Sequence, residues 1–181
     1  MKPWFAGGRC ERWLLEADPA AVFGVIGDSQ PAISEALIKR LRGRVGQPER
    51  ICLIPRLPES EYLRLVRSAS VLLDPPHYGA GANTLADALA CAVPLVAWEG
   101  PFHRARWVSG GYRALGVEGL TATTAEEWAT LATRIADDSD WRRHQSRQMQ
   151  AAAERFFAPS PAAAELRDWF LTTIAAAREH R

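Results

Sequence analysis

The feature that most constrains the fold of this chain is the alternation of short apolar runs with longer amphipathic segments. Four runs are apolar enough to be buried on both faces: 21–26, 51–54, 70–73 and 94–98. Segments of helical periodicity separate them, which is the pattern of β-α-β units whose helices cover both faces of a parallel sheet. The sequence therefore predicts an α/β fold with a doubly wound parallel sheet.

Helix signals lie between these runs. Ser29 can cap and Pro31 can open a first helix, which Gly43 ends. A second helix is expected after Pro58. A third is expected over 85–92, where strong helix formers follow a stretch punctuated by glycine. Each interval between the predicted strands is therefore expected to hold one helix.

After the fourth run the pattern changes to one helix after another. A helix is expected over 102–115. Thr124 and Glu127 have the spacing of a capping box, in which the threonine oxygen and the glutamate bind free backbone donors at a helix start. Ser139 and the pair Ser160-Pro161 mark two further helix starts.

These C-terminal helices, from about 124 to 178, are expected to belong to a single domain that covers 1–181. No linker or shift of composition divides the chain, and 181 residues are too few for two domains of ordinary size. The last helix, 161–178, carries a stripe of large apolar residues that needs something to cover it. The stripe consists of Leu166, Trp169, Phe170 and Ile174.

The charge balance argues against a nucleic-acid or membrane partner. Lys and Arg total 22 against 21 acids, which gives a net charge of +1, and no long basic run is present. No stretch reaches the roughly 18 apolar residues of a membrane span, and 1–18 lacks the pattern of a secretory signal. Cys10, Cys52 and Cys91 lack the spacing of a metal site, and two lie in apolar runs, which is typical of reduced core thiols. A cytoplasmic location is expected.

The loop 74–84 carries the clearest chemical signal. It follows a predicted strand and opens a helix, and ligands of parallel sheets bind beyond the carboxyl ends of the strands. Free N–H groups in the first turn of a helix carry partial positive charge, and small residues let the backbone approach a ligand. Asn83 and Thr84 add side-chain donors, while Asp87 is placed to accept hydrogen bonds from sugar hydroxyls. The loop predicts an anion pocket, and a merely structural turn is the alternative.

Other chemistries have less support. The loop lacks the Gly-Lys-Ser/Thr ending of a Walker A motif, and no G-x-G-x-x-G follows the first strand. None of the four histidines, His77 included, recurs at metal-ligand spacing. There is no G-x-S-x-G elbow and no convincing pair of nucleophile and base. No metal is expected, and the catalytic base is not assigned.

Four motifs follow one another over 50–116. They are a strand ending near Pro55, a helix around Tyr62, the LLDPP stretch that leads through the loop and Asp87 to VPLV, and a stretch from Gly100 to Arg106 ahead of Leu115-Gly116. In this order and spacing they resemble the carboxyl-terminal catalytic half of the O-linked N-acetylglucosamine transferase family, the Spindly-like proteins. Looser similarity at both ends extends the resemblance over most of the chain.

The resemblance implies the donor-binding half of a GT-B-type glycosyltransferase, a Rossmann-like domain that grips the UDP part of UDP-GlcNAc or a related nucleotide sugar. It implies that Asn83 and Thr84 contact the diphosphate and that Asp87 lies near the ribose. It also implies that the backbone around Arg56 and Leu57 recognises uracil.

Two further roles follow from the resemblance. Tyr62 takes the place of a histidine that packs by the base, a role that aromatic stacking would preserve. Lys2 stands where the family has a catalytic lysine that neutralises charge on the departing UDP, and an N-terminal lysine without that role is the alternative. The other expected donor-binding residues lie in the loop and are His77, Tyr78, Gly79, Gly81 and Ala82.

The implied activity is transfer of N-acetylglucosamine to Ser/Thr hydroxyls of a protein acceptor, with the UDP-sugar as donor substrate. The family's other catalytic domain and its acceptor-binding repeats have no counterpart here, so the resemblance implies a half enzyme, inactive alone, that pairs with the missing N-terminal half. The chain departs from the family at Cys91-Ala92, ahead of Val93-Pro94, where the family usually has a glycine, and at Leu65, where some members have an arginine that faces the phosphate.

Two other interpretations remain open. A non-catalytic Rossmann-like module would dock a protein partner through exposed aromatics such as Trp4, Trp107 and Trp169. Another nucleotide-sugar enzyme, such as an epimerase, would share the architecture but needs paired carboxylates, and the sequence shows no such pair.

Overall fold

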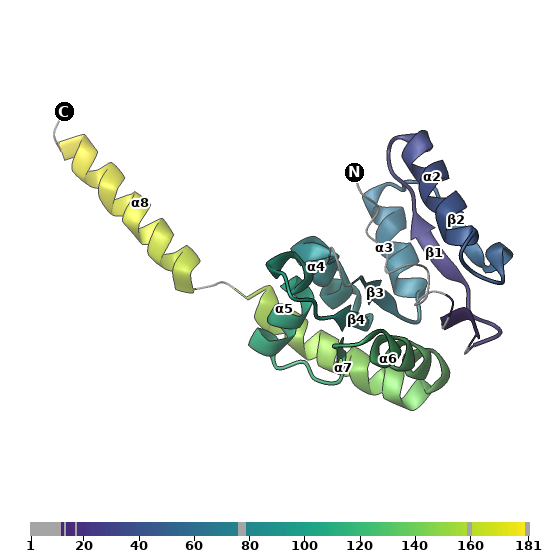
Figure 1. The fold of residues 1–181 in the computed structure, drawn as a ribbon. Coiled ribbons are helices and arrows are strands. Elements are labelled where there is room, and N and C mark those ends of the chain that lie inside the picture. Colours follow the sequence, from purple (N-terminus) through teal and green to yellow (C-terminus); the bar gives the residue numbers. More distant parts are fainter. Residues whose placement is uncertain (1–11, 13, 17, 76–78, 159–160, 180–181) are drawn as a thin grey trace.

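All strand pairing in the described part of the chain is parallel (Figure 1). The structure is a computed structural model that describes residues 12, 14–16, 18–75, 79–158 and 161–179. Strand β1 (Phe23–Ile26) pairs with β2 (Ile51–Ile54), and β4 (Leu95–Trp98) lies between β3 (Leu72–Asp74) and β5 (Thr121–Ala122). The α/β fold with parallel strands is therefore confirmed.

A helix follows each of the first four strands along the chain, as the alternation of apolar runs predicts. The helices are α2 (Pro31–Arg42), α3 (Glu59–Ser68), α4 (Gly81–Cys91) and α5 (Trp107–Leu115). Short 3-10 helices, η1 (Pro48–Arg50) and η2 (His103–Ala105), precede β2 and α5. The C-terminal part consists of α6 (Ala125–Asp137), α7 (Ser139–Phe156) and α8 (Pro161–Glu179).

Two predictions about helix starts are wrong. The helix expected over 102–115 is divided, because Arg106 leaves helical geometry (φ −124°, ψ 5°) between η2 and α5. The Nε–H of Arg106 donates to the carbonyl of Gly100 at 2.8 Å, which stabilises this turn. Ser29 does not cap α2, whose N-cap residue is Gln30. The carboxylate of Asp28 instead accepts a hydrogen bond from the Gln30 amide at 2.9 Å.

The capping box at the start of α6 is confirmed. The Glu127 amide donates to the Thr124 hydroxyl oxygen at 3.1 Å, and the Glu127 carboxylate accepts from the Thr124 amide at 3.3 Å. Helix α7 begins at Ser139 as expected, but the capping carboxylate belongs to Asp138, which accepts from the amides of Asp140 and Trp141. Side-chain oxygens thus satisfy free amides at both helix starts.

Strand β4 lies at the centre of the main core. Its residues Leu95, Val96 and Ala97 are fully buried, and α6 packs against it while α4 packs against α5 and α7. A Cβ at position 111 would come within 2.4 Å of the Leu85 side chain, so glycine there permits the close approach of α5 to α4. Buried hydrogen bonds from the Tyr112 hydroxyl to the Leu95 carbonyl (2.6 Å) and from the Trp128 indole to the Val96 carbonyl (3.1 Å) tie helices to the strand.

The cysteine prediction is wrong for Cys52. Cys52 is exposed and Cys91 is half-buried, so Cys52 is not a core thiol. Successive side chains of a strand point to opposite faces, and in β2 the fully buried position is taken by Ile51.

Helix α8 projects away from the rest of the chain in Figure 1. Its side chains are exposed over 161–177, including Trp169, which is 59% exposed, and the other members of the predicted apolar stripe. No described part of the chain covers the stripe, so the expectation that something covers it stays a prediction. Within the described residues, no helix combines the length and the apolar character needed to cross a bilayer.

Candidate functional site: the mouth of helix α4

Two backbone contacts hold the end of the loop that enters α4. The Gly79 amide donates to the carbonyl of Arg104 at 3.0 Å, and the Ala80 amide donates to the carboxylate of Asp74, the last residue of β3. A Cβ at position 79 would come within 2.8 Å of the Arg104 carbonyl oxygen and 3.1 Å of Asp74 Oδ1. Position 79 therefore requires glycine, because the chain passes between two oxygen atoms.

The first turn of α4 is open toward solvent. Ala82 and Asn83 are exposed, and Gly81 is half-buried with φ +79°. Among the described residues, no acceptor binds the amides of Gly81, Ala82 or Asn83, and this first turn contains no acidic residue. Free amides and an uncompensated helix dipole attract anions, so the geometry fits the predicted anion pocket.

Thr84 is less available as a donor than Asn83. Its hydroxyl donates to the carbonyl of Ala80, one turn back, at 2.9 Å. The side chain of Thr84 is half-buried, whereas Asn83 is exposed. The Asn83 side chain and the backbone amides therefore remain the principal donors at this helix end.

Asp74 was not predicted from the sequence as a site residue. It is 1% exposed, and its burial raises the carboxyl pKa to about 6, although the hydrogen bond from the Ala80 amide opposes the shift. Burial disfavours the charged form of a carboxyl group, and a hydrogen bond to that form favours it. The signal that identifies this residue is a carboxylate at the end of a buried strand, directly before the loop.

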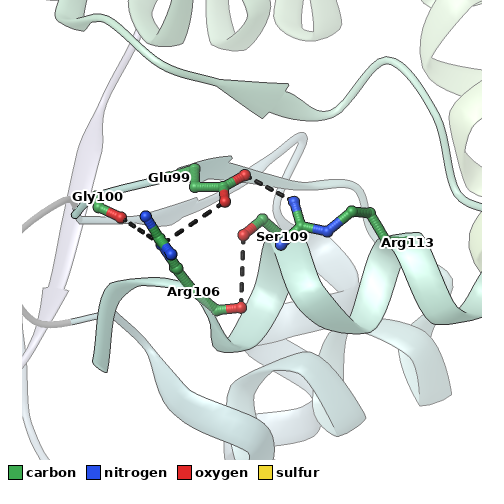
Figure 2. A network of polar contacts seen from close by, with 5 residues as sticks. All are labelled: Glu99, Gly100, Arg106, Ser109 and Arg113. Atoms are coloured by element: carbon green, nitrogen blue, oxygen red, sulfur yellow. Dashed lines mark hydrogen bonds and ion pairs between the residues drawn. The ribbon is translucent and has the colours of Figure 1, made fainter. Parts of the chain in front are cut away.

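A second loop, which follows β4, supports the first. Figure 2 shows Glu99 between two arginines: Arg113 donates to its carboxylate at 2.7 Å, and Arg106 lies 3.7 Å from the other oxygen. The hydrogen bond from Arg113 is the main cause that lowers the pKa of Glu99. Because Arg106 also binds the Gly100 carbonyl, this network holds the segment that presents the Arg104 carbonyl to Gly79.

Tyr62 and Asp87 come together across α3 and α4. The Tyr62 hydroxyl donates to Asp87 Oδ2 at 2.8 Å, and both side chains are half-buried. Burial and the bond to Asp87 raise the pKa of Tyr62 to about 12, so the phenol stays protonated at neutral pH. The structure thus joins two residues that the resemblance assigns to the nucleoside end of the donor.

The remaining predicted site residues are less well connected. Arg56 is exposed and Leu57 half-buried in the segment between β2 and α3, and no hydrogen bond within the described residues joins them to the α4 mouth. Lys2, His77 and Tyr78 lie outside the described residues. In the part of the chain that is described, no three His, Cys, Asp or Glu side chains are grouped to hold a metal ion.

No protein-family model matches the chain. Among solved structures, it is similar to a mutant O-GlcNAc transferase from Thermobaculum terrenum, with a TM-score of 0.75 and 26% sequence identity over 89% of this chain and 32% of that one. It is also similar to HepE from Anabaena, solved with UDP and glucose and with UDP-glucose, at a TM-score of 0.65 and 16% identity over 97% of this chain and 46% of that one.

The first of these similarities confirms the resemblance to the carboxyl-terminal half of O-GlcNAc transferases. The second, at 16% identity, supports the fold alone. The chain therefore has the α/β fold of part of a GT-B-type glycosyltransferase, with parallel strands and additional C-terminal helices. It spans about a third of the length of the first solved protein and somewhat less than half of the second.

Proposed function

We propose that this chain binds the UDP part of a UDP-sugar at the mouth of α4, as the donor-binding half of a glycosyltransferase. The observation that carries the proposal is the open first turn of α4, where exposed Ala82 and Asn83 present amides without an acceptor among the described residues. A diphosphate supplies the negative charge that such a turn attracts. The complexes of HepE with UDP and with UDP-glucose support the same ligand class on this fold.

The proposed reaction is transfer of N-acetylglucosamine to Ser or Thr hydroxyls of a protein, by direct displacement at the anomeric carbon. As the bond from the anomeric carbon to the diphosphate breaks, negative charge grows on the diphosphate oxygens. The amides of the first α4 turn, the Asn83 side chain and Lys2 are assigned to stabilise that charge, because donors already aimed at developing charge lower a barrier most. In this scheme, hydrogen bonds from the amides stabilise the charge on the leaving group without a metal ion.

The acceptor and the opposite wall of the cleft are proposed to come from a second, N-terminal half. Transfer requires an acceptor held against the anomeric carbon and exclusion of water from the reacting groups. We therefore expect this chain to bind a UDP-sugar without transferring the sugar, and we expect transfer when a matching half is added.

Selective stabilisation by uridine nucleotides is the first test. Thermal unfolding is measured with UDP, UDP-GlcNAc, ADP and GDP, because a ligand that binds only the folded state raises its stability by about 2.7 kcal/mol at a concentration 100 times its Kd. Stabilisation by the two uridine compounds alone supports the proposal. The absence of any response favours a protein-docking module, for which the exposure of Trp107 (48%) and Trp169 (59%) is the supporting observation.

Substitution of Asn83 locates the binding site. Asn83→Asp keeps the side-chain size but places a carboxylate in the first turn of α4, where it stabilises the helix dipole by about 0.3–1 kcal/mol and repels a diphosphate. The variant is expected to unfold at a slightly higher temperature than the parent without ligand, and to lose at least about tenfold in UDP affinity. Gln30→Glu, which converts an amide to a carboxylate at the N-terminus of α2, is the matched control, and its UDP affinity should equal that of the parent. If Asn83→Asp binds UDP as tightly as the parent does, the nucleotide does not bind at the first turn of α4.

A further inference from the structure

The hydrogen bond between Tyr62 and Asp87 involves only one of the two carboxylate oxygens. The phenol donates to Oδ2 at 2.8 Å, and no described residue donates to Oδ1. Asp87 lies on α4 two turns beyond its mouth and is half-buried, so part of the side chain remains accessible to a ligand. The second oxygen is therefore an acceptor without a protein donor among the described residues.

Tyr62 fixes the orientation of that oxygen. An Asp side chain with one bound oxygen has its second torsion restricted, because rotation would break a charge-assisted hydrogen bond. Tyr62 itself lies on α3, which packs against α4, and its side chain is half-buried. The free oxygen of Asp87 thus has one preferred direction before any ligand arrives.

We propose that Tyr62 is a positioning residue, which holds Asp87 so that Oδ1 accepts a hydrogen bond from a ribose hydroxyl of the bound nucleotide. This inference rests on the proposed function and deepens it, because it makes recognition of ribose depend on a tyrosine hydroxyl that does not contact the sugar. A ribose hydroxyl is a donor of the right chemistry for an oriented, half-buried carboxylate oxygen.

A purely structural role for the same bond predicts a different result. If the hydrogen bond only ties α3 to α4, its loss destabilises the fold and weakens every nucleotide to the same degree. If it positions Asp87, its loss weakens only nucleotides that carry ribose hydroxyls. A comparison of nucleotides with and without ribose hydroxyls therefore distinguishes the two roles.

The experiment measures the affinity of the full chain for UDP and for its 2′,3′-dideoxy analogue by titration calorimetry. Tyr62→Phe removes the hydroxyl and keeps the ring. It is expected to weaken UDP binding by about three- to tenfold, the effect of one ordinary hydrogen bond, and to change the affinity for the dideoxy analogue by less than about twofold. Ser68→Ala is the control on the same helix. The Ser68 hydroxyl donates to the Leu65 carbonyl, and its removal should change neither affinity.

Asp87→Asn supplies the second measurement. If Tyr62 acts through Asp87, then adding Tyr62→Phe to Asp87→Asn causes no further loss of UDP affinity. An equal loss for both nucleotides, no loss for either, or full additivity with Asp87→Asn overturns the inference while UDP binding by the parent chain stands. Failure of the parent chain to bind UDP at all overturns the proposed function, and the role of Tyr62 with it.

Discussion

Single residues set the electrostatics of the α4 mouth. Gly79 allows the loop before α4 to approach Arg104, and Asp74 accepts a hydrogen bond from the Ala80 amide. In the segment after β4, Glu99 pairs with two arginines. The carboxylates of Asp74 and Glu99 thus hold the loops that lead to α4, while the amides of the first α4 turn stay free of any described acceptor.

Asp74 makes stability depend on pH in an unusual direction. Its carboxyl pKa is about 6 in the folded chain against 3.8 in the unfolded one, so the folded state binds the proton more tightly. The contribution of Asp74 to stability is therefore greatest below about pH 4 and falls by about 3 kcal/mol as pH rises through 6.

Asp74→Asn removes that dependence while an amide oxygen can still accept from Ala80. Relative to the parent, the stability of the variant is expected to rise by about 2 kcal/mol between pH 4 and pH 7.5, measured as the difference in free energy of unfolding by urea at each pH. A constant difference between variant and parent at the two pH values would contradict the assignment.

Single residues also show where sequence reasoning reaches its limit at the site. Asn83, Thr84 and Gly81 were predicted because the glycine-rich loop is local in sequence, and the structure places them at the start of α4. Asp74 was missed because its burial and raised pKa come from packing of distant segments, which no short motif encodes.

Helices and strands follow the sequence where local signals are strong. The apolar run 51–54 coincides with β2, and the capping box places the start of α6. The two-residue strand β5 was not predicted, because it is too short for any periodicity and depends on pairing with β4. The break in the helix expected over 102–115 was also missed, because it depends on the contact of Arg106 with a carbonyl six residues earlier.

The end of α4 carries a strained residue. Ala92 has φ 54°, a left-handed conformation that costs an L-residue with a Cβ about 1 kcal/mol and costs glycine little. Ala92→Gly is expected to raise the free energy of unfolding by roughly 0.5–1 kcal/mol, measured by chemical denaturation.

Gly116 at the end of α5 provides the matched control. It has φ 64°, and a Cβ there would meet nothing closer than 4.0 Å, so Gly116→Ala tests the backbone conformation without a clash. It should lower stability by a similar amount. A loss of stability in Ala92→Gly would show that the alanine side chain contributes more through packing than its backbone conformation costs.

For the whole molecule, α8 is separate from the core that the other elements form. Its side chains over 161–177 are exposed, and no other described segment buries its large apolar residues. Removal of 159–181 is therefore expected to change the unfolding temperature by less than about 2 °C, because exposed residues contribute little to stability. The same deletion should lower self-association in light scattering, since an exposed apolar stripe promotes contact between molecules. A fall of several degrees would show that α8 packs against the core in solution.

Position 79 offers a means of sorting related sequences by function. Two oxygen atoms lie where a side chain would begin, so any replacement must separate the end of β3 from η2 and distort the entrance to α4. If the proposed function holds, a homologue that keeps the sheet and helices but has a larger residue at the equivalent of Gly79 is expected to retain the fold and lose affinity for the nucleotide. The residue at this one position of an alignment would then separate homologues that bind the nucleotide from homologues that do not.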